Sequence, residues 1–137
     1  MNPIEASELE RMLEMAYEAM ERAYVPYSNF RVGACLKASS GKYYCGCNIE
    51  NAAYTPTNCA ERTAVFHAVY EGEREFDAIA VACSGENPAF PCGVCRQVLS
   101  EFCAPDMPVL CGNAARERYQ TTLGQLLPHS FGKKDLL

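Results

Sequence analysis

The sequence lacks any stretch that could serve as a membrane span or an export signal. No apolar run among the 137 residues approaches the ~20 consecutive residues that a transmembrane helix needs. The first residues, Met1 to Glu5, contain neither a basic segment nor the apolar core of a secretory signal. We therefore expect a cytosolic protein that does not bind a membrane.

An excess of positive charge is also missing. The formal net charge is -5 at pH 7, with 12 Lys and Arg against 17 Asp and Glu. The basic residues are scattered, apart from the pair Lys133 and Lys134. Binding to a nucleic acid polymer draws much of its affinity from Lys and Arg that neutralise phosphates. We therefore expect a small-molecule partner and no nucleic acid polymer.

No linker, internal repeat or low-complexity segment divides the sequence. A chain of 137 residues suits one domain, here residues 1–137, and buries roughly two-thirds of its unfolded surface on folding. Hydrophobic residues make up 49% and charged residues 21%, as in ordinary globular proteins. We expect a single domain whose core forms without disulfide bonds.

Hydrophobic periodicity predicts an alternation of helices and strands. Ser7 and Glu10 have the spacing of a capping box, which predicts that a helix over about 7–23 begins there. Further helices are expected at about 59–71, 92–102 and 123–127, strands at about 30–37, 42–47, 77–84, 108–111 and 116–122, and a loop at 48–58. This order predicts an α/β fold with a mixed sheet covered by helices on both faces.

Nine cysteines are many for a protein in a reducing compartment, where they indicate metal binding or catalysis before disulfides. Cys92 and Cys95 form a C-x-x-C motif at the start of a predicted helix. Positions i and i+3 share one helical face, and a helix N-terminus favours the thiolate form that binds metal. A redox-active dithiol is the alternative interpretation of this motif.

A second motif, Cys59-Ala60-Glu61, also opens a predicted helix. Together with Cys92 and Cys95, Cys59 would supply three thiolates and leave one zinc position open for water, as in catalytic sites. Two alternatives remain at this point. A fourth thiolate from Cys45 or Cys47 would close the site into a structural one. Glu61 would equally serve as the capping partner of Asn58.

The two cysteine motifs, with Pro91 before Cys92, resemble in order and content the pattern of the zinc deaminases. Within that superfamily the sequence resembles the short, homotetrameric cytidine deaminases over nearly its whole length. The blocks that carry this resemblance are 26–34, 47–54, 58–63, 91–97 and 126–128 with Phe131. The resemblance implies a three-layer α-β-α sandwich around a mixed five-stranded sheet, with one Zn²⁺ per chain. It also implies hydrolytic deamination of free cytidine and deoxycytidine in pyrimidine salvage.

The same resemblance implies a role for each site residue. Cys59, Cys92 and Cys95 bind zinc, and Glu61 moves a proton from the attacking water to N3 of the pyrimidine. Independently of the resemblance, three thiolates leave a negative charge on Zn²⁺, which predicts that Arg62 hydrogen-bonds the ligand sulfurs to offset it; the alternative for Arg62 is a surface residue. The implied substrate-binding residues are Phe30 against the base, Asn48 and Glu50 at the ribose, the Ala60 N–H at the base oxygen, and Tyr54 and Phe131 from neighbouring subunits.

Phe90 departs from the family, which usually has Ser or Thr before the Pro-Cys pair. A deaminase of another small base, of a nucleoside antibiotic or of a nucleoside monophosphate is the nearest alternative. Phe30 with the pair Asn48 and Glu50 favours a pyrimidine nucleoside, and no obvious phosphate site is present. His67 and His129 match no ligand pattern.

Overall fold

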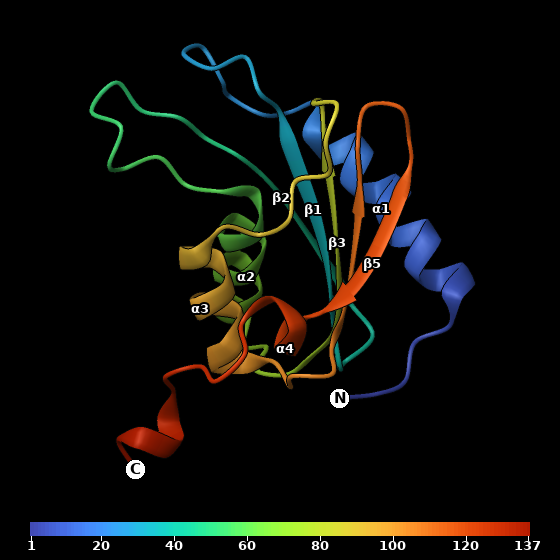
Figure 1. The fold of residues 1–137 in the computed structure, drawn as a ribbon, viewed down its shortest axis with the longest axis vertical. Helices are drawn as coiled ribbons and strands as arrows, with labels where there is room; N and C mark the ends of the chain where they lie inside the picture. Colours follow the sequence, from blue (N-terminus) through green and yellow to red (C-terminus); the bar gives the residue numbers. More distant parts are fainter.

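The computed structural model describes residues 1–137, and a five-stranded sheet lies at its centre (Figure 1). The strands follow the spatial order β2-β1-β3-β4-β5, and only β3 and β4 run parallel to each other. Their bounds are β1 Val32–Ala38, β2 Tyr43–Cys47, β3 Phe76–Cys83, β4 Pro108–Gly112 and β5 Arg118–Thr122. The mixed sheet predicted from the order of the elements is confirmed.

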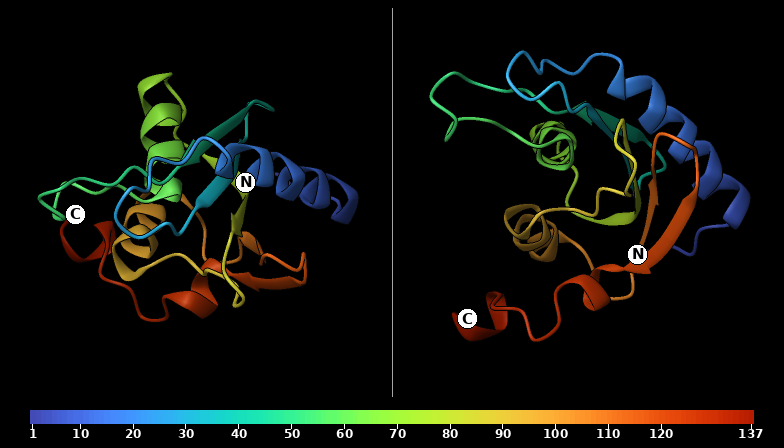
Figure 2. Two further views of the ribbon diagram at one scale, coloured as in Figure 1. Left: turned by 90° about the horizontal axis from the view of Figure 1, so that it is seen from above. Right: turned by 45° about the horizontal axis from the view of Figure 1, so that its top comes forward.

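Helices cover both faces of this sheet. The helix α1 (Ala6–Met20) packs on one face, and α2 (Ala60–Tyr70) and α3 (Gly93–Phe102) lie on the other (Figure 2). A short helix α4 (Leu123–Leu126) and a 3-10 turn η1 (Lys133–Asp135) complete the chain. The three-layer arrangement implied by the resemblance is therefore confirmed. None of these helices has the length and apolar character needed to cross a membrane.

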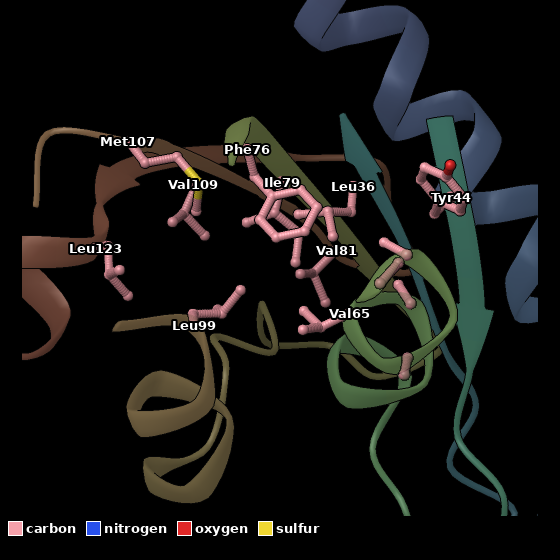
Figure 3. Close-up of a cluster of buried hydrophobic side chains, with 14 of the residues drawn as sticks. Leu36, Tyr44, Val65, Phe76, Ile79, Val81, Leu99, Met107, Val109 and Leu123 are labelled. Carbon is pink, nitrogen blue, oxygen red and sulfur yellow. The ribbon is translucent and has the colours of Figure 1, made fainter. Parts of the chain in front are cut away.

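The central strand β3 is buried along its whole length, as its continuous apolar sequence predicts. Its larger side chains, such as Ile79 and Val81, meet Val65 of α2 and Leu99 of α3 in the larger core cluster (Figure 3). Its alanines face α1 in the smaller cluster. A Cβ on Gly33 would lie 2.0 Å from a carbonyl oxygen of α1, so this close helix–sheet contact requires glycine.

Three local predictions are wrong. The first helix begins with Glu5 as N-cap, without a side-chain capping bond, because the Glu5 carbonyl already accepts the N–H of Leu9 at 3.0 Å. Ser7 and Glu10 are therefore interior residues and form no capping box. The helix also ends at Met20 rather than near residue 23. The first strand begins at Val32, two residues later than predicted, and the 3-10 turn η1 was not predicted at all.

Two loops project beyond the end of the sheet at which α2 begins (Figure 1). They are residues 21–31, which follow α1, and residues 48–59, which connect β2 to α2. Bridges from Ile49 to Tyr24 and to Asn58 hold these loops side by side. This arrangement brings the sequence blocks 26–34, 47–54 and 58–63 to one region of the molecule.

Candidate metal centre and active site

The three predicted metal ligands converge at the beginnings of two helices. Cys59 is the N-cap residue of α2, Cys92 is the N-cap residue of α3, and Cys95 follows in the first turns of α3. Their sulfur atoms all lie within 4.8 Å of one another, and those of Cys59 and Cys92 are 3.7 Å apart. Zn–S bonds of about 2.3 Å in a tetrahedral site separate two sulfurs by about 3.8 Å. The three cysteines therefore fit a zinc ion with one open position.

This sulfur group answers two of the alternatives. Neither Cys45 nor Cys47 belongs to it, so a closed four-thiolate site is not formed. A redox dithiol needs only Cys92 and Cys95, so it does not account for the sulfur of Cys59 in the same group. The geometry thus favours an open, catalytic type of metal site.

Positive charge surrounds the sulfur of Cys59. The guanidinium of Arg62 donates a hydrogen bond from Nη2 to this sulfur over 3.3 Å. Hydrogen bonds from the thiol of Cys95 and from Arg62 lower the pKa of Cys59 to about 5. The N-termini of α2 and α3 add their positive dipole ends at the same place. Arg62 therefore contacts a predicted ligand, as the charge of three thiolates predicts, and is not a free surface residue.

Glu61 is a buried acid beside this group. Its side chain is only 4% exposed, and burial raises the pKa of its carboxyl to about 7. The capping alternative for this residue is wrong, because Cys59 is the N-cap and no side chain caps α2. The amide of Asn58 instead donates to the hydroxyl of Thr63 over 3.0 Å. A carboxyl with a pKa near neutral pH is suited to both accept and release a proton.

A cavity of about 200 Å³ is lined by Glu61 and by two of the metal-site cysteines, Cys59 and Cys92. Its walls are mostly apolar, which suits a flat heterocyclic base. A second, more open cavity of about 400 Å³ shares Thr57 with the first and is more polar. Phe30, Val32, Asn48, Asn58, Ala60, Ala89 and Phe90 line the first cavity, and Tyr27, Ser28, Glu50, Asn51 and Tyr54 line the second.

Asn48 and Glu50 are held in place by the loop after α1. The Asn48 side chain, 9% exposed, accepts the Val32 N–H at 2.9 Å and donates to the Phe30 carbonyl at 2.8 Å. These two bonds fix the Asn48 side chain between Phe30 and the start of β1. Glu50 accepts the N–H groups of Tyr27 and Ser28 at 3.0 and 3.1 Å and the hydroxyl of Ser28. The Ser28 hydroxyl and these N–H groups lower the pKa of Glu50.

Tyr54 and Phe131 are placed differently from the other predicted residues. Tyr54 lines the second cavity but is 72% exposed, with a left-handed backbone at φ 63°. Phe131 is 59% exposed and lies on the C-terminal segment, where its carbonyl accepts the amide of Gln97 at 2.9 Å. The C-terminal segment lies beyond α4 at the lower end of the molecule (Figure 1), and Phe131 lines neither site cavity. The chain does not bring Phe131 to its own site.

Several residues at the site were not predicted from the sequence. Thr57 joins the two cavities and Ser28 binds the Glu50 carboxylate, although both lie in or near the blocks that carry the resemblance. The departure at Phe90 is part of the cavity wall. Arg96 is structural, because it ties the Pro91 carbonyl at 2.6 Å to α4. These contacts join segments that are distant in sequence, so no local motif signals them.

The family model of the cytidine and deoxycytidylate deaminase zinc-binding region matches residues 6–111. The chain belongs to this family. It is 52% identical to the cytidine deaminase of Sporosarcina psychrophila over 129 residues, which cover 94% of this chain and 95% of that protein. It is 47% identical to the cytidine deaminase of Halalkalibacterium halodurans, covering 91% and 95% of the two chains.

A solved structure agrees with these relatives. The crystal structure of cytidine deaminase from Burkholderia pseudomallei superimposes with a TM-score of 0.85 at 47% identity, covering 89% of this chain and 98% of that one. The resemblance noted in the sequence is therefore confirmed, and with it membership of a zinc-binding family.

Proposed function

We propose that the protein hydrolyses the 4-amino group of free cytidine and deoxycytidine, producing uridine and deoxyuridine with release of ammonia. The observation that supports this proposal most directly is the buried Glu61, which lines a mostly apolar cavity together with Cys59 and Cys92. The 52% identity to a cytidine deaminase over most of both chains supports this assignment.

Cys59, Cys92 and Cys95 would hold the zinc ion, and Arg62 would stabilise their negative charge through the Cys59 sulfur. When bound, Zn²⁺ supplies a Lewis acid that makes water a potent nucleophile near neutral pH. The helix N-termini of α2 and α3 serve the same electrostatic purpose, since they favour the thiolate forms of the ligands.

Glu61 carries the protons of the reaction. It accepts the proton that the attacking water loses and delivers it to N3 of the pyrimidine as the new bond to C4 forms. A second proton then passes from the new hydroxyl to the amino nitrogen, and ammonia leaves with the electrons of the C4–N bond. The pKa of about 7 allows Glu61 to exchange protons in both directions at little cost.

The remaining residues would position the nucleoside. Phe30 lies in the wall of the first cavity, where an aromatic ring can pack on the base, and the Ala60 N–H would meet the base oxygen. Glu50 is an ionised acceptor for a sugar hydroxyl in the adjoining cavity. Asn48 uses one amide hydrogen for the Phe30 carbonyl, which leaves the second for the ribose.

We further propose a cytoplasmic homotetramer that acts in pyrimidine salvage, with sites completed by Tyr54 and Phe131 of neighbouring subunits. The exposure of both aromatics, and the absence of Phe131 from the lining of both site cavities, support this assignment. Truncation before Phe131 should weaken nucleoside binding while each chain keeps its zinc. Unchanged substrate kinetics in the truncated protein would contradict the shared site.

The test of the activity is a substrate panel with the zinc-loaded protein. Cytidine and deoxycytidine should be converted to uridine and deoxyuridine, with one ammonia released per product. Cytosine, guanine and cytidine monophosphate should react much more slowly, because they lack the sugar or bring a phosphate for which no site is evident. Zinc-loaded protein that releases ammonia from guanine but not from cytidine would overturn the assignment.

A further inference from the structure

Three sulfur-containing side chains, those of Met15, Cys35 and Cys45, are neighbours on the face of the sheet opposite the active site. Cys35 of β1 lies directly across from Cys45 of β2, so their side chains leave the sheet on the same side. That side is the one covered by α1, since Cys35 belongs to the core cluster beneath this helix. From α1, the thioether of Met15 approaches the sulfur of Cys35 to 3.9 Å. The three sulfurs thus come from three different elements.

This sulfur group is buried on one side and open on the other. Cys35 has no exposed surface, whereas Cys45 is exposed. Cys45 and Met15 both line an open pocket of about 420 Å³ on the surface beside α1. A small ion can therefore reach Cys45 from solvent, while Cys35 supplies a ligand from the dry interior. Arg22 and Glu18 line the same pocket, so it holds one basic and one acidic side chain.

The two thiols also change each other's pKa. The neighbouring Cys35 thiol lowers the pKa of Cys45, whereas the neighbouring Cys45 and burial raise the pKa of Cys35. The exposed member of the pair is therefore the one that more readily becomes a thiolate. Thiolate is the form that binds metal, so binding would begin at Cys45 and displace the proton of Cys35 afterwards.

We propose that Cys35, Cys45 and Met15 form a second metal site, for a soft monovalent ion such as Cu(I) or Ag(I). Thiolate and thioether ligands together select Cu(I). The zinc site of Cys59, Cys92 and Cys95 differs, because it offers only thiolates and one open position. With metal–sulfur bonds of about 2.3 Å, a trigonal site separates its sulfurs by about 4.0 Å. The 3.9 Å between Cys35 and Met15 matches this spacing.

Binding of the ion releases protons and leaves a small net charge. Each thiol that binds releases one proton, so two thiolates on Cu(I) carry one net negative charge. Arg22 and Glu18 both line the pocket and carry opposite charges, so the softness of the ligands selects the ion, and the charge of the pocket does not. No electron is transferred, because the ion enters already in its reduced state.

The experiment is an anaerobic titration of the zinc-loaded protein with Cu(I), in the presence of a phosphine reductant. A chromophoric chelator supplies the Cu(I), and its absorbance reports how much the protein has bound. Wild type should bind about one Cu(I) per chain before any zinc is released, as expected for a separate sulfur site. Cys45→Ser should lose this binding, and Met15→Leu should weaken it by about tenfold or more, because a sulfur ligand is removed. Both variants should keep zinc and deaminase activity.

Cys47→Ser is the matched control. Cys47 lies on the same strand and the same face as Cys45, but its partner across the sheet is Gly33, which offers no sulfur. This variant should bind Cu(I) like wild type. The proposal fails if Cys45→Ser retains the zinc-sparing Cu(I) binding. It fails equally if the first Cu(I) expels zinc from wild type, because the metal would then have entered through Cys59, Cys92 and Cys95.

Discussion

Substituting Glu61 by Gln separates the proton-carrying role of this side chain from every structural role. Gln has the same size and hydrogen-bonding reach, but it cannot take up and release a proton. General acid–base transfers contribute roughly 10²–10⁴-fold each, and Glu61 is assigned to more than one transfer. We therefore expect Glu61→Gln to lower cytidine turnover by at least about 10³-fold, or about 4 kcal/mol of activation barrier.

Folding and zinc content should be unaffected by this substitution. The carboxyl is 4% exposed and its burial opposes the charged form, so a neutral amide of equal volume removes no favourable charge. No side chain caps α2, so no cap is lost either. The thermal midpoint and the bound zinc should equal those of wild type.

Turnover, zinc content and thermal stability should be measured on one preparation, with Glu71→Gln as the control. Glu71 is the exposed C-cap of the same helix, and its substitution should leave turnover unchanged. A tenfold loss of turnover corresponds to only ~1.4 kcal/mol of activation barrier. If Glu61→Gln turns over cytidine within about tenfold of wild type, the proton-carrying role is refuted. Loss of zinc from this variant would show instead that Glu61 is a ligand.

Three further predictions concern the support of the site. Arg62→Ala should weaken zinc retention by about 10–100-fold in a chelator competition, because a hydrogen bond to a ligand sulfur is lost; unchanged retention would remove this residue from the site. Gly33→Ala should lower the free energy of unfolding in urea by at least about 2 kcal/mol, since a Cβ there would lie 2.0 Å from a carbonyl of α1, whereas Gly132→Ala, with open space around it, should not. Ser28→Ala should raise the pKa of Glu50, whose value the Ser28 hydroxyl lowers. On acidification, Glu50 should then become protonated at a higher pH than in wild type, and nucleoside binding should weaken from that higher pH downwards. The pH profile of KM measures this shift, and an unshifted profile would contradict the role of Glu50.

Most elements could be predicted because their signals lie between near neighbours in the sequence. The apolar run at 77–84 predicted a strand buried on both faces, and every residue of β3 is buried. Predictions failed at element ends, where competing partners decide. The spacing of Ser7 and Glu10 also occurs inside helices. In this chain α1 begins earlier, because the carbonyl of Glu5 accepts the first hydrogen bonds of the helix. Likewise, the Asn58 amide hydrogen-bonds the hydroxyl of Thr63, and it forms no capping box with Glu61.

The sequence by itself determined which residues carry the chemistry. The spacing of Cys92 and Cys95 places two thiols on one face of a helix, and the blocks around them identify the family. Only the tertiary structure decided that Cys59, 33 positions away from Cys92, brings its sulfur to 3.7 Å, and that no fourth cysteine joins. It also decided that Glu61 is buried and that Asn48 holds the Phe30 loop. Convergence and burial depend on how distant segments pack against one sheet, and local periodicity does not encode that packing.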